Sequence, residues 1–400
     1  MLLIDPDFDD EVYLTLEAYD QKLSRILFDF ADFKSFSTFG KLLNLLDLNE
    51  KAPSMVLFSN FKVDKKFKDG VYYKINREGL IKFRDRFIPH EDSSVIGYDV
   101  DMRKGSLNEL LNGSGKPSGT EYTDSLSIER FDGATNLKID YGEHTQLIVR
   151  HVRQGSWNEF LFNDEPKVVF DMGTAYFEKK IFVKNLVAQR DSDYQKSRPN
   201  LILSHWDIDH YHMLLEAEDE TIKSFSSFIY RARIPNQTSD RVLSRFKSLN
   251  PTAIFGVSPF SASPKKSSER LIPFGKVRNG LQLYNGSENK SRNKSGLTLC
   301  FHNQNLTVVC GADLDYSQLD NFILPNYDPK HDHYLVVPHH GGLAGKLVYN
   351  TDNLTSKDAI ISVGPNNYGH PLFEVKEFLK GKKFQIANLQ CRSHYILNLT

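Results

Sequence analysis

The sequence predicts a mixed α/β (α+β) protein in which two β-sheets pack face to face between layers of helices, preceded by an additional helix-rich N-terminal domain. Three observations lead to this prediction. Short apolar strands alternate with helical segments after residue 137, several of these strands end in polar loops, and a Gly- and Ser-rich stretch at 112–119 separates two regions of different texture. We therefore expect an α+β domain of unknown role at residues 1–130 and the sandwich at residues 131–400.

The first domain begins with a strongly acidic segment. Residues 5–20 contain seven carboxylates and no Lys or Arg. From Val12 to about Asp47, apolar residues recur at helical spacing, with a second helix expected at about 41–48. The span 55–90 then has the pattern of strands, with apolar or aromatic runs at 55–58 and 71–73. The acidic start and the helical spacing predict that helices make up much of this domain.

The second domain is expected to consist mainly of short strands. A helix is expected near 176–187, and the segment at 297–310 is expected to form a hairpin, because two apolar runs flank His302-Asn303-Gln304-Asn305. The predicted strands lie at 137–141, 146–152, 159–162, 167–170, 201–203, 297–301, 306–310, 334–337 and 358–363.

Composition excludes several classes of protein. The formal net charge of −1 argues against a nucleic-acid binder that depends on overall basicity, so such binding would need a local basic patch. The three cysteines form no CxxC pair or disulfide framework, which fits a reducing compartment. The N-terminus lacks the pattern of a signal peptide, and no apolar run is long enough to span a membrane. We expect a cytoplasmic protein without membrane contact.

The segment that follows the strand at 201–203 carries the strongest chemical signal. Four potential metal ligands lie within six residues, at His205, Asp207, Asp209 and His210. Any one of them has an ordinary explanation in a polar surface loop, with Asp209 capping the next helix. Together, two imidazoles and two carboxylates in a tight loop favour a site for two adjacent metal ions that share a hydrolytic water.

Four other loops that follow strands carry similar side chains. They contain Asp171, Asp313, the pair His339-His340, and the sequence Gly364 to Pro371. A site with two metal ions needs a bridging carboxylate, for which Asp313 is the natural candidate, and an imidazole from His339 or His340 would complete the second ion's ligands.

These five loops, in this order, resemble the metallo-β-lactamase fold superfamily over about residues 136–400. The superfamily's HxHxDH motif appears here as His205-Trp206-Asp207-Ile208-Asp209-His210, with Asp in place of the second His. This substitution, Pro338-His339-His340-Gly341-Gly342, and Gly369-His370-Pro371 are most similar to the ComEC-type branch, which includes the hydrolase domain of the bacterial DNA-uptake channel. The resemblance implies an αββα metallo-β-lactamase sandwich and phosphodiester chemistry.

The resemblance also implies a role for each matching residue. His205 and Asp207 would bind one ion, Asp209 and His210 the other, and Asp313 would bridge them. His340 would be the terminal ligand of the second ion, with His339 as ligand or neighbour. Asp171 would orient a ligand rather than bind metal. Zinc is the default for the two divalent ions, and Asp207 makes manganese plausible because a carboxylate is a harder ligand than an imidazole.

The superfamily commonly supplies another His between the second and third loops, and the matching stretch 293–297 has none. His212, just after the main motif, is expected at a helix surface, with an extra ligand as the alternative. His302, His331 and His333 are also expected at the surface. His370 would contact or protonate a scissile phosphate group, or else occupy a turn, and Asn367 in the same loop is expected to contact substrate.

A local basic segment lies between the second and third chemical loops. Residues 265–294 contain eight Lys or Arg against two Glu, and the first three, Lys265, Lys266 and Arg270, are expected to bind phosphate groups of a substrate. A solvated surface loop is the alternative.

The sequence thus predicts a metal-dependent hydrolase, a phosphodiesterase or nuclease that cleaves nucleic acid by a metal-bound hydroxide, in which Asp209 also orients the water. One alternative is a small-molecule hydrolase acting on a lactone, a cyclic nucleotide or a choline phosphodiester. The other is a non-catalytic subunit of a defence or DNA-processing complex, and residues 1–130 could bind a protein partner in either case.

Overall fold

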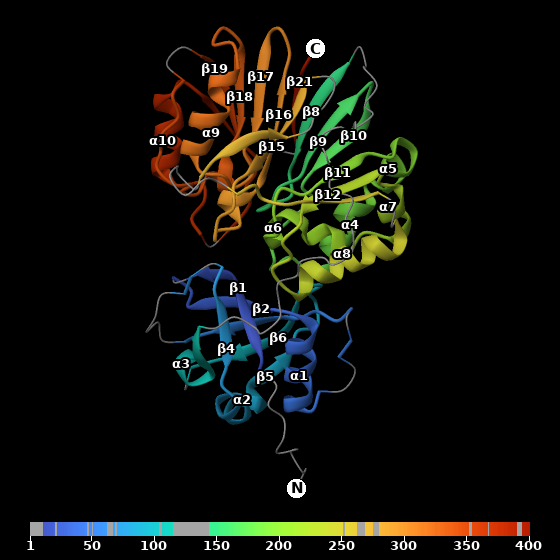
Figure 1. The fold of residues 1–400 in the computed structure, drawn as a ribbon, viewed down its shortest axis with the longest axis vertical. Helices are drawn as coiled ribbons and strands as arrows, with labels where there is room; N and C mark the ends of the chain where they lie inside the picture. The colour runs from blue at the N-terminus through green and yellow to red at the C-terminus, as the bar shows by residue number, and fades with distance from the viewer. Residues whose placement is uncertain are drawn as a thin grey trace. The chain divides into compact units, whose positions relative to one another are not determined.

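The computed structural model describes residues 11–20, 22–45, 48–49, 51–61, 67–68, 70–103, 106–114, 144–250, 253–261, 269–274, 280–351, 354–366, 368–389 and 394–400. The chain divides into two compact units, shown as a ribbon in Figure 1. Unit 1 consists of Met1–Thr123 and Ile234–Ser244, and unit 2 of Asp124–Arg233 and Arg245–Thr400. The domain boundary expected near residue 130, and the strand expected at 137–141, lie outside the described residues.

Unit 1 is built on a seven-stranded sheet with the strand order β5-β6-β3-β2-β1-β4-β7. Most neighbouring strands are antiparallel, and β3 and β6 are parallel. Its elements are β1 (Tyr13–Asp20), β2 (Arg25–Phe30), α1 (Phe33–Leu43), β3 (Met55–Ser59), β4 (Tyr72–Ile75), α2 (Arg77–Phe83), η1 (Arg84–Arg86), β5 (Phe87–Pro89), β6 (Ile96–Asp101), α3 (Leu107–Leu110) and β7 (Leu111–Ser114).

The prediction that helices make up much of the N-terminal domain is wrong for residues 13–30. These residues form the antiparallel pair β1 and β2, in which Leu14 lies opposite Phe30 and Leu16 opposite Phe28. The segment also alternates, with Leu14 and Leu16 two residues apart, so it fits a strand, and pairing with its neighbours decides the outcome. The first helix is α1, whose N-cap Asp32 accepts a hydrogen bond from Ser35 N, and it ends before Asn44, which has a positive φ.

The buried core of unit 1 is dominated by phenylalanines from β2, β3, α1 and α2, including Phe28, Phe36 and Phe58. The segment 234–244 is tied to this unit through the fully buried Asp29. Asp29 accepts hydrogen bonds from Ser54 Oγ (2.6 Å) and from Thr238 N (2.9 Å). A stretch distant in sequence therefore satisfies a buried carboxylate of the N-terminal unit.

Unit 2 contains two seven-stranded sheets. Their orders are β13-β12-β11-β10-β9-β8-β21 and β14-β15-β16-β17-β18-β19-β20. The elements of the first half are β8 (Thr145–Arg150), β9 (Asn158–Phe162), β10 (Glu165–Phe170), α4 (Lys180–Ala188), α5 (Asp191–Ser197), β11 (Asn200–Ile202), α6 (Ile208–Tyr211), η2 (His212–Leu215), α7 (Asp219–Ser224), β12 (Ser227–Arg231), α8 (Gln237–Leu249, whose first residues belong to unit 1) and β13 (Ile254–Val257).

The second half supplies the other sheet and its helices. Its elements are β14 (Leu271–Phe274), β15 (Leu281–Gly286), η3 (Asn293–Ser295), β16 (Leu297–His302), β17 (Leu306–Cys310), α9 (Tyr316–Phe322), η4 (Leu324–Asn326), β18 (Asp332–Val336), η5 (Pro338–Gly341), β19 (Thr355–Ile361), α10 (Phe373–Gly381), β20 (Gln385–Asn388) and β21 (His394–Asn398). The hairpin expected at 297–310 is confirmed as the antiparallel pair β16 and β17. Asn303 shapes its turn by accepting hydrogen bonds from Asn305 N and Leu306 N.

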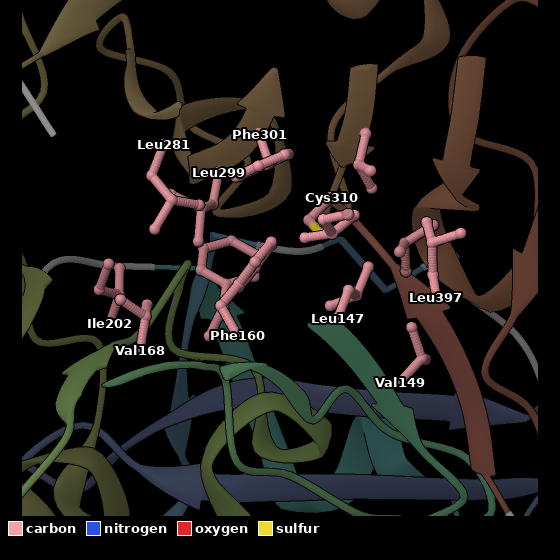
Figure 2. Close-up of a cluster of buried hydrophobic side chains, with 14 of the residues drawn as sticks. Leu147, Val149, Phe160, Val168, Ile202, Leu281, Leu299, Phe301, Cys310 and Leu397 are labelled. Carbon is pink, nitrogen blue, oxygen red and sulfur yellow. The ribbon is translucent and has the colours of Figure 1, made fainter. Parts of the chain in front are cut away.

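The two sheets of unit 2 pack face to face through a continuous apolar core. Figure 2 shows side chains of one sheet, such as Phe160 and Val168, pointing at side chains of the other, such as Leu299 and Cys310. A second core, which includes Leu319 and Leu379, lies beneath α9 and α10 on the outer face of the second sheet. At about 1.5–3 kcal/mol for each large side chain buried, these layers are the main source of the unit's stability.

The order of strands places several loops at one edge of this sandwich. Strands β10, β11 and β12 are parallel, as are β17, β18 and β19. The carboxyl ends of parallel strands lie at the same edge of a sheet, so the loops after β10, β11, β17 and β18 can meet there.

The predicted fold class is confirmed: helices flank two packed sheets in unit 2, and the chain as a whole is mixed α/β. Within the described residues, no helix is sufficiently long and apolar to cross a bilayer.

Candidate metal centre

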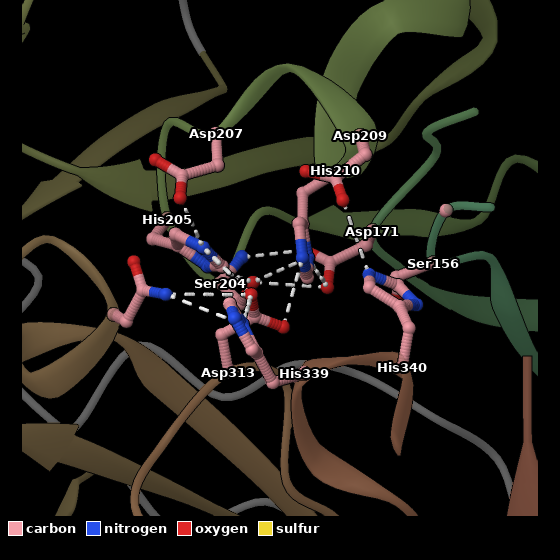
Figure 3. Close-up of polar contacts among 12 residues, drawn as sticks. Ser156, Asp171, Ser204, His205, Asp207, Asp209, His210, Asp313, His339 and His340 are labelled. Carbon is pink, nitrogen blue, oxygen red and sulfur yellow. Dashed lines mark hydrogen bonds and ion pairs between the residues drawn. The ribbon is translucent and has the colours of Figure 1, made fainter. Parts of the chain in front are cut away.

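The loop after β11 and the start of α6 carry four of the predicted ligands, at the edge of the sandwich where the parallel strands of unit 2 end. Asp207 occupies the N-cap position of the short helix α6, yet its side chain makes no capping hydrogen bond. Instead, its Oδ2 lies 3.4 Å from His205 Nε2, and both residues face the other predicted ligands (Figure 3). Asp209 and His210 lie inside α6. The helix-cap explanation therefore does not account for the loop's carboxylates.

Asp171, at the end of β10, organises this loop from beneath. It is fully buried and has a positive φ of 61°, a conformation that Asp adopts more readily than most residues. Its carboxylate accepts hydrogen bonds from Ser204 N (2.7 Å), Ser204 Oγ (2.9 Å) and His210 Nδ1 (2.8 Å). Asp171 thus holds one ring nitrogen of His210 as a donor and leaves Nε2 free to act as a ligand.

Asp313 enters the centre from the second sheet, just after β17. Its Oδ1 lies 3.2 Å from His210 Nε2, and its Oδ2 lies 2.6 Å from His339 Nδ1 and 3.9 Å from His205 Nε2. Two residues later, Asp315 forms a capping box with Gln318 at the start of α9. The same loop therefore supplies one carboxylate to the helix and another to the centre.

His339 and His340 lie in two consecutive left-handed backbone positions, each with a φ of 53°. Such positions are costly for residues other than Gly and are concentrated at functional sites. His340 Nδ1 donates to the carbonyl of Ser362 (2.9 Å), and its Nε2 lies 3.2 Å from Asp209 Oδ2. His339 contacts Asp313 instead. Of the two histidines, His340 is the one placed among the candidate ligands.

The candidate ligands form two overlapping groups, His205 with His210 and Asp313, and Asp209 with His210 and His340. Within each group the ligand atoms lie within 4.8 Å of one another. The Nε2 atoms of His205, His210 and His340, and Oδ1 of Asp313, are buried and have no hydrogen-bond partner among the described residues. Buried imidazole nitrogens and carboxylate oxygens that face one another fit a divalent cation.

The carboxylates and imidazoles of the centre shift one another's pKa values. Burial by itself would lower the pKa of His210, but the carboxylates of Asp313 and Asp171 outweigh it and raise the pKa well above its usual value. Burial also opposes protonation of His339, yet Asp313 raises its pKa to about 9. The pKa of Asp313 is held well below its usual value, because His210 and His339 outweigh its burial. A bound cation would replace these protons.

His370 lies beside the centre but outside both ligand groups. Its ring lies 5.7 Å from that of His339, between centroids, and burial lowers its pKa to about 4. Asn366 holds the loop by accepting a hydrogen bond from His370 N (3.0 Å) and donating one to His370 O (2.8 Å). Neutral His370 at physiological pH favours a hydrogen-bonding role over that of an imidazolium acid. Asn367, expected to contact substrate, lies outside the described residues.

The basic segment is only partly described. Lys265 and Lys266 lie outside the described residues, and the guanidinium of Arg270 lies over the ring of Phe322, 5.9 Å from its centroid. Among the described residues of this segment, Arg292 reaches the centre, and its Nε lies 2.9 Å from Asp207 Oδ1.

Sequence reasoning missed four residues of the centre: Ser204, Arg292, Asn293 and Asn366. Arg292 stood out only as one of eight basic residues, and Asn293 only as a position without the commonly found His. Polar residues in loops have no periodicity, so their partners become visible only in the folded chain.

Two histidines expected at the surface are buried. His212 donates through Nδ1 to the carbonyl of Ala175 (3.0 Å) and belongs to neither ligand group. His333, in β18, lies 2.8 Å from the hydroxyl of Tyr349 through Nε2. In both cases the folded chain supplies a buried hydrogen-bond partner that the local sequence does not reveal.

Two solved structures are similar to part of this chain. The first is the metallo-β-lactamase fold protein YhfI from Bacillus subtilis, at 11% identity and a TM-score of 0.37, covering 64% of this chain and 100% of that protein. The second is the E377D mutant of the CmlA β-hydroxylase, at 12% identity and a TM-score of 0.36, covering 65% of this chain and 55% of that one.

No protein-family model matches the chain, and no curated protein matches it. We therefore infer function from the side chains of the centre itself.

Proposed function

We propose that this chain is a metal-dependent phosphodiesterase that cleaves nucleic acid. The observation that carries the proposal is a set of buried ligand atoms on His205, His210, His340 and Asp313 that face one another and have no hydrogen-bond partner within the described part of the chain. Buried polar atoms of this kind destabilise a fold by about 1–3 kcal/mol each unless they are satisfied, so their convergence is best explained by a bound cation.

Asp209, His210, His340 and Asp313 would hold a divalent ion. Bound there, it would lower the pKa of a water molecule and neutralise charge on the substrate. The protein fixes the ligands beforehand: Asp171 fixes the ring of His210, and the carbonyl of Ser362 fixes that of His340. The side chain of Asp209 is 22% exposed, so its carboxylate can also accept a hydrogen bond from an attacking water.

The proposal that the substrate is a phosphodiester depends on the side chains around the candidate ligands. Asp207 occupies the position of the second His in the HxHxDH motif of the metallo-β-lactamase fold superfamily, which this sequence resembles. This substitution is typical of the phosphodiester-cleaving branch of that superfamily. His370 Nδ1 is buried and has no hydrogen-bond partner among the residues that the structure describes. As a neutral imidazole, His370 would bind a phosphoryl oxygen or the leaving group by a hydrogen bond. Zinc or manganese would suit this mixed set of imidazoles and carboxylates.

Incubation of the purified protein with zinc or manganese and a panel of substrates tests the proposal. The panel contains linear, circular and single-stranded DNA, RNA and bis-p-nitrophenyl phosphate, together with a cyclic nucleotide, a choline phosphodiester and a lactone. We expect cleavage of a nucleic acid, reduced by at least about a thousandfold in Asp209→Asn and His210→Ala because each removes a ligand. His144→Ala, at an exposed position of the same unit, is the matched control.

Turnover of only the cyclic nucleotide, choline ester or lactone would identify a small-molecule hydrolase instead. Stoichiometric metal without turnover of any substrate would favour a non-catalytic binding subunit. Either result contradicts the nuclease proposal.

A further inference from the structure

Arg292 reaches into the candidate metal centre from the loop between β15 and β16. Its Nε forms an ion pair with Asp207 Oδ1 (2.9 Å), and one of its terminal nitrogens donates to the carbonyl of Trp206 (3.1 Å). The side chain is only 15% exposed. The guanidinium is therefore a mostly buried cation against the carboxylate that was expected to bind a metal ion.

The loop that carries Arg292 is firmly held. The buried Arg231 of β12 donates to the side chain of Asn285 (2.5 Å) and to the carbonyls of Gly286 and Ser295 on either side of Arg292. Leu297 N donates to Ser204 O (2.8 Å), which joins the end of this loop to the start of the ligand loop. Arg292 is thus positioned by the fold rather than carried on a free surface arm.

Asn293, the next residue, lies beside the carboxylate of Asp313 and the ring of His339. Its Nδ2 lies 3.5 Å from Asp313 Oδ2 and 3.4 Å from His339 Nδ1. The nitrogen that Asn293 presents to these two groups is an amide nitrogen, which donates hydrogen bonds and has no lone pair suited to a divalent ion.

The two candidate ligand groups cannot both be filled completely. Both include His210, whose Nδ1 bonds to Asp171, so that only Nε2 is free. An imidazole nitrogen has one lone pair and binds one ion. If His210 joins Asp209 and His340, the other side retains His205 and the shared Asp313, while Asp207 is paired with Arg292 and belongs to neither group.

We propose that the guanidinium of Arg292 takes the place of a second metal ion at Asp207, so that the centre binds one divalent ion tightly. That ion lies with Asp209, His210 and His340, next to Asp313, and Arg292 neutralises Asp207. This inference rests on the metal site of the proposed function and replaces the expectation of two ions.

Metal stoichiometry tests this inference independently of activity. Metal-stripped protein is dialysed against a micromolar excess of Mn²⁺, and the bound metal per chain is measured by mass spectrometry. We expect one ion in the wild-type protein and in Arg292→Lys, which keeps the positive charge. Arg292→Ala and Arg292→Gln free Asp207 and are expected to bind a second ion. Lys290→Ala, an exposed cation on the same loop, is the control and should bind one.

A second variant tests the role of Asn293. In the Arg292→Gln background, Asn293→His supplies an additional imidazole beside Asp313, so the second ion should bind at least about tenfold more tightly. Circular dichroism establishes that each variant is folded before its metal content is compared.

Two ions in the wild-type protein, or one ion in folded Arg292→Ala and Arg292→Gln, would overturn the role of Arg292 while leaving the proposed hydrolase intact. No bound metal in the wild-type protein would overturn the metal centre, and with it both proposals.

Discussion

At the scale of single residues, the candidate centre is defined by which ring nitrogen of each histidine is engaged. His210 and His340 use Nδ1 to donate to an acceptor that lies behind them, Asp171 and the carbonyl of Ser362, respectively. Ser204 Oγ donates to Asp171 and can accept from His205 Nδ1 (2.9 Å). Each of these rings therefore directs Nε2 into the centre, which is the arrangement that a metal ligand requires.

Asp171→Asn tests this arrangement. The amide replaces one carboxylate oxygen by a donor, so it cannot accept hydrogen bonds from both Ser204 and His210. We expect metal affinity to fall by about 10- to 100-fold with the ligands themselves intact. Isothermal titration with Zn²⁺ or Mn²⁺ measures the change.

Asp164→Asn, at an exposed turn before the same strand, serves as the matched control and should bind metal as the wild-type protein does. Equal affinities for Asp171→Asn and the control would refute the positioning role of Asp171.

At the scale of elements, the loops after β8 and β10 hold the backbone of α6 by hydrogen bonds. Met172 N donates to the carbonyl of His210 (2.8 Å), and Ser156 N donates to that of Asp209 (3.0 Å). A Cβ on Gly173 would lie 1.9 Å from the carbonyl oxygen of Asp209 and 2.4 Å from His210 N. Only glycine allows this close approach of two backbones.

Gly173→Ala should therefore disturb both stability and metal binding. The atoms that the added methyl group meets belong to the backbone, so no side-chain rotation relieves the contact. We expect a loss of about 1–3 kcal/mol in the free energy of unfolding, together with weaker metal binding as Asp209 and His210 shift. Urea denaturation and metal titration measure the two effects.

Gly381→Ala, at the end of α10, would meet no atom within 4 Å and should change stability by less than about 0.5 kcal/mol. If Gly173→Ala changes the free energy of unfolding as little as this control does, the close approach of Gly173 to the backbone of Asp209 and His210 does not limit stability, and the prediction is wrong.

At the scale of the whole molecule, folding stability should depend on pH through His333. This residue is buried in β18, and burial lowers its pKa from 6.5 to about 3. Between these pH values the unfolded chain binds a proton at His333 and the folded chain does not. The contribution of His333 to the free energy of unfolding is therefore fully present above pH 6.5 and is lost as the pH falls toward 3. From pH 7 to pH 5 the expected loss is roughly 2 kcal/mol.

His333→Gln removes this titrating group, so its free energy of unfolding should change less than that of the wild-type protein between pH 7 and pH 5. Urea denaturation at both values measures the difference. Tyr349→Phe deletes the hydrogen-bond partner but leaves the imidazole buried, so it should retain the wild-type pH dependence. Identical pH dependence in His333→Gln and the wild-type protein would contradict the assignment.

Much of the sandwich was predictable because its strands are short, apolar and bounded by turn residues. The hairpin at 297–310 and the strands at 167–170 and 334–337 follow from pattern alone, since both faces of these strands are buried. The span 13–30 was wrongly predicted as helical, because short apolar segments fit both periodicities and pairing between β1 and β2 decides between them. The burial of His212 and His333 likewise depends on partners distant in sequence.

By itself, the sequence determined the candidate ligands: His205, Asp207, Asp209 and His210 in one loop, with Asp313 and the pair His339-His340 after later strands. Ligand type and spacing are local properties, so they can be read along the chain. The tertiary structure places His340 rather than His339 in a candidate ligand group, as the resemblance implied, and it alone brings Arg292 to Asp207. Those contacts join the two sheets of the sandwich, and charge pairing across such distances in sequence depends on packing rather than on pattern.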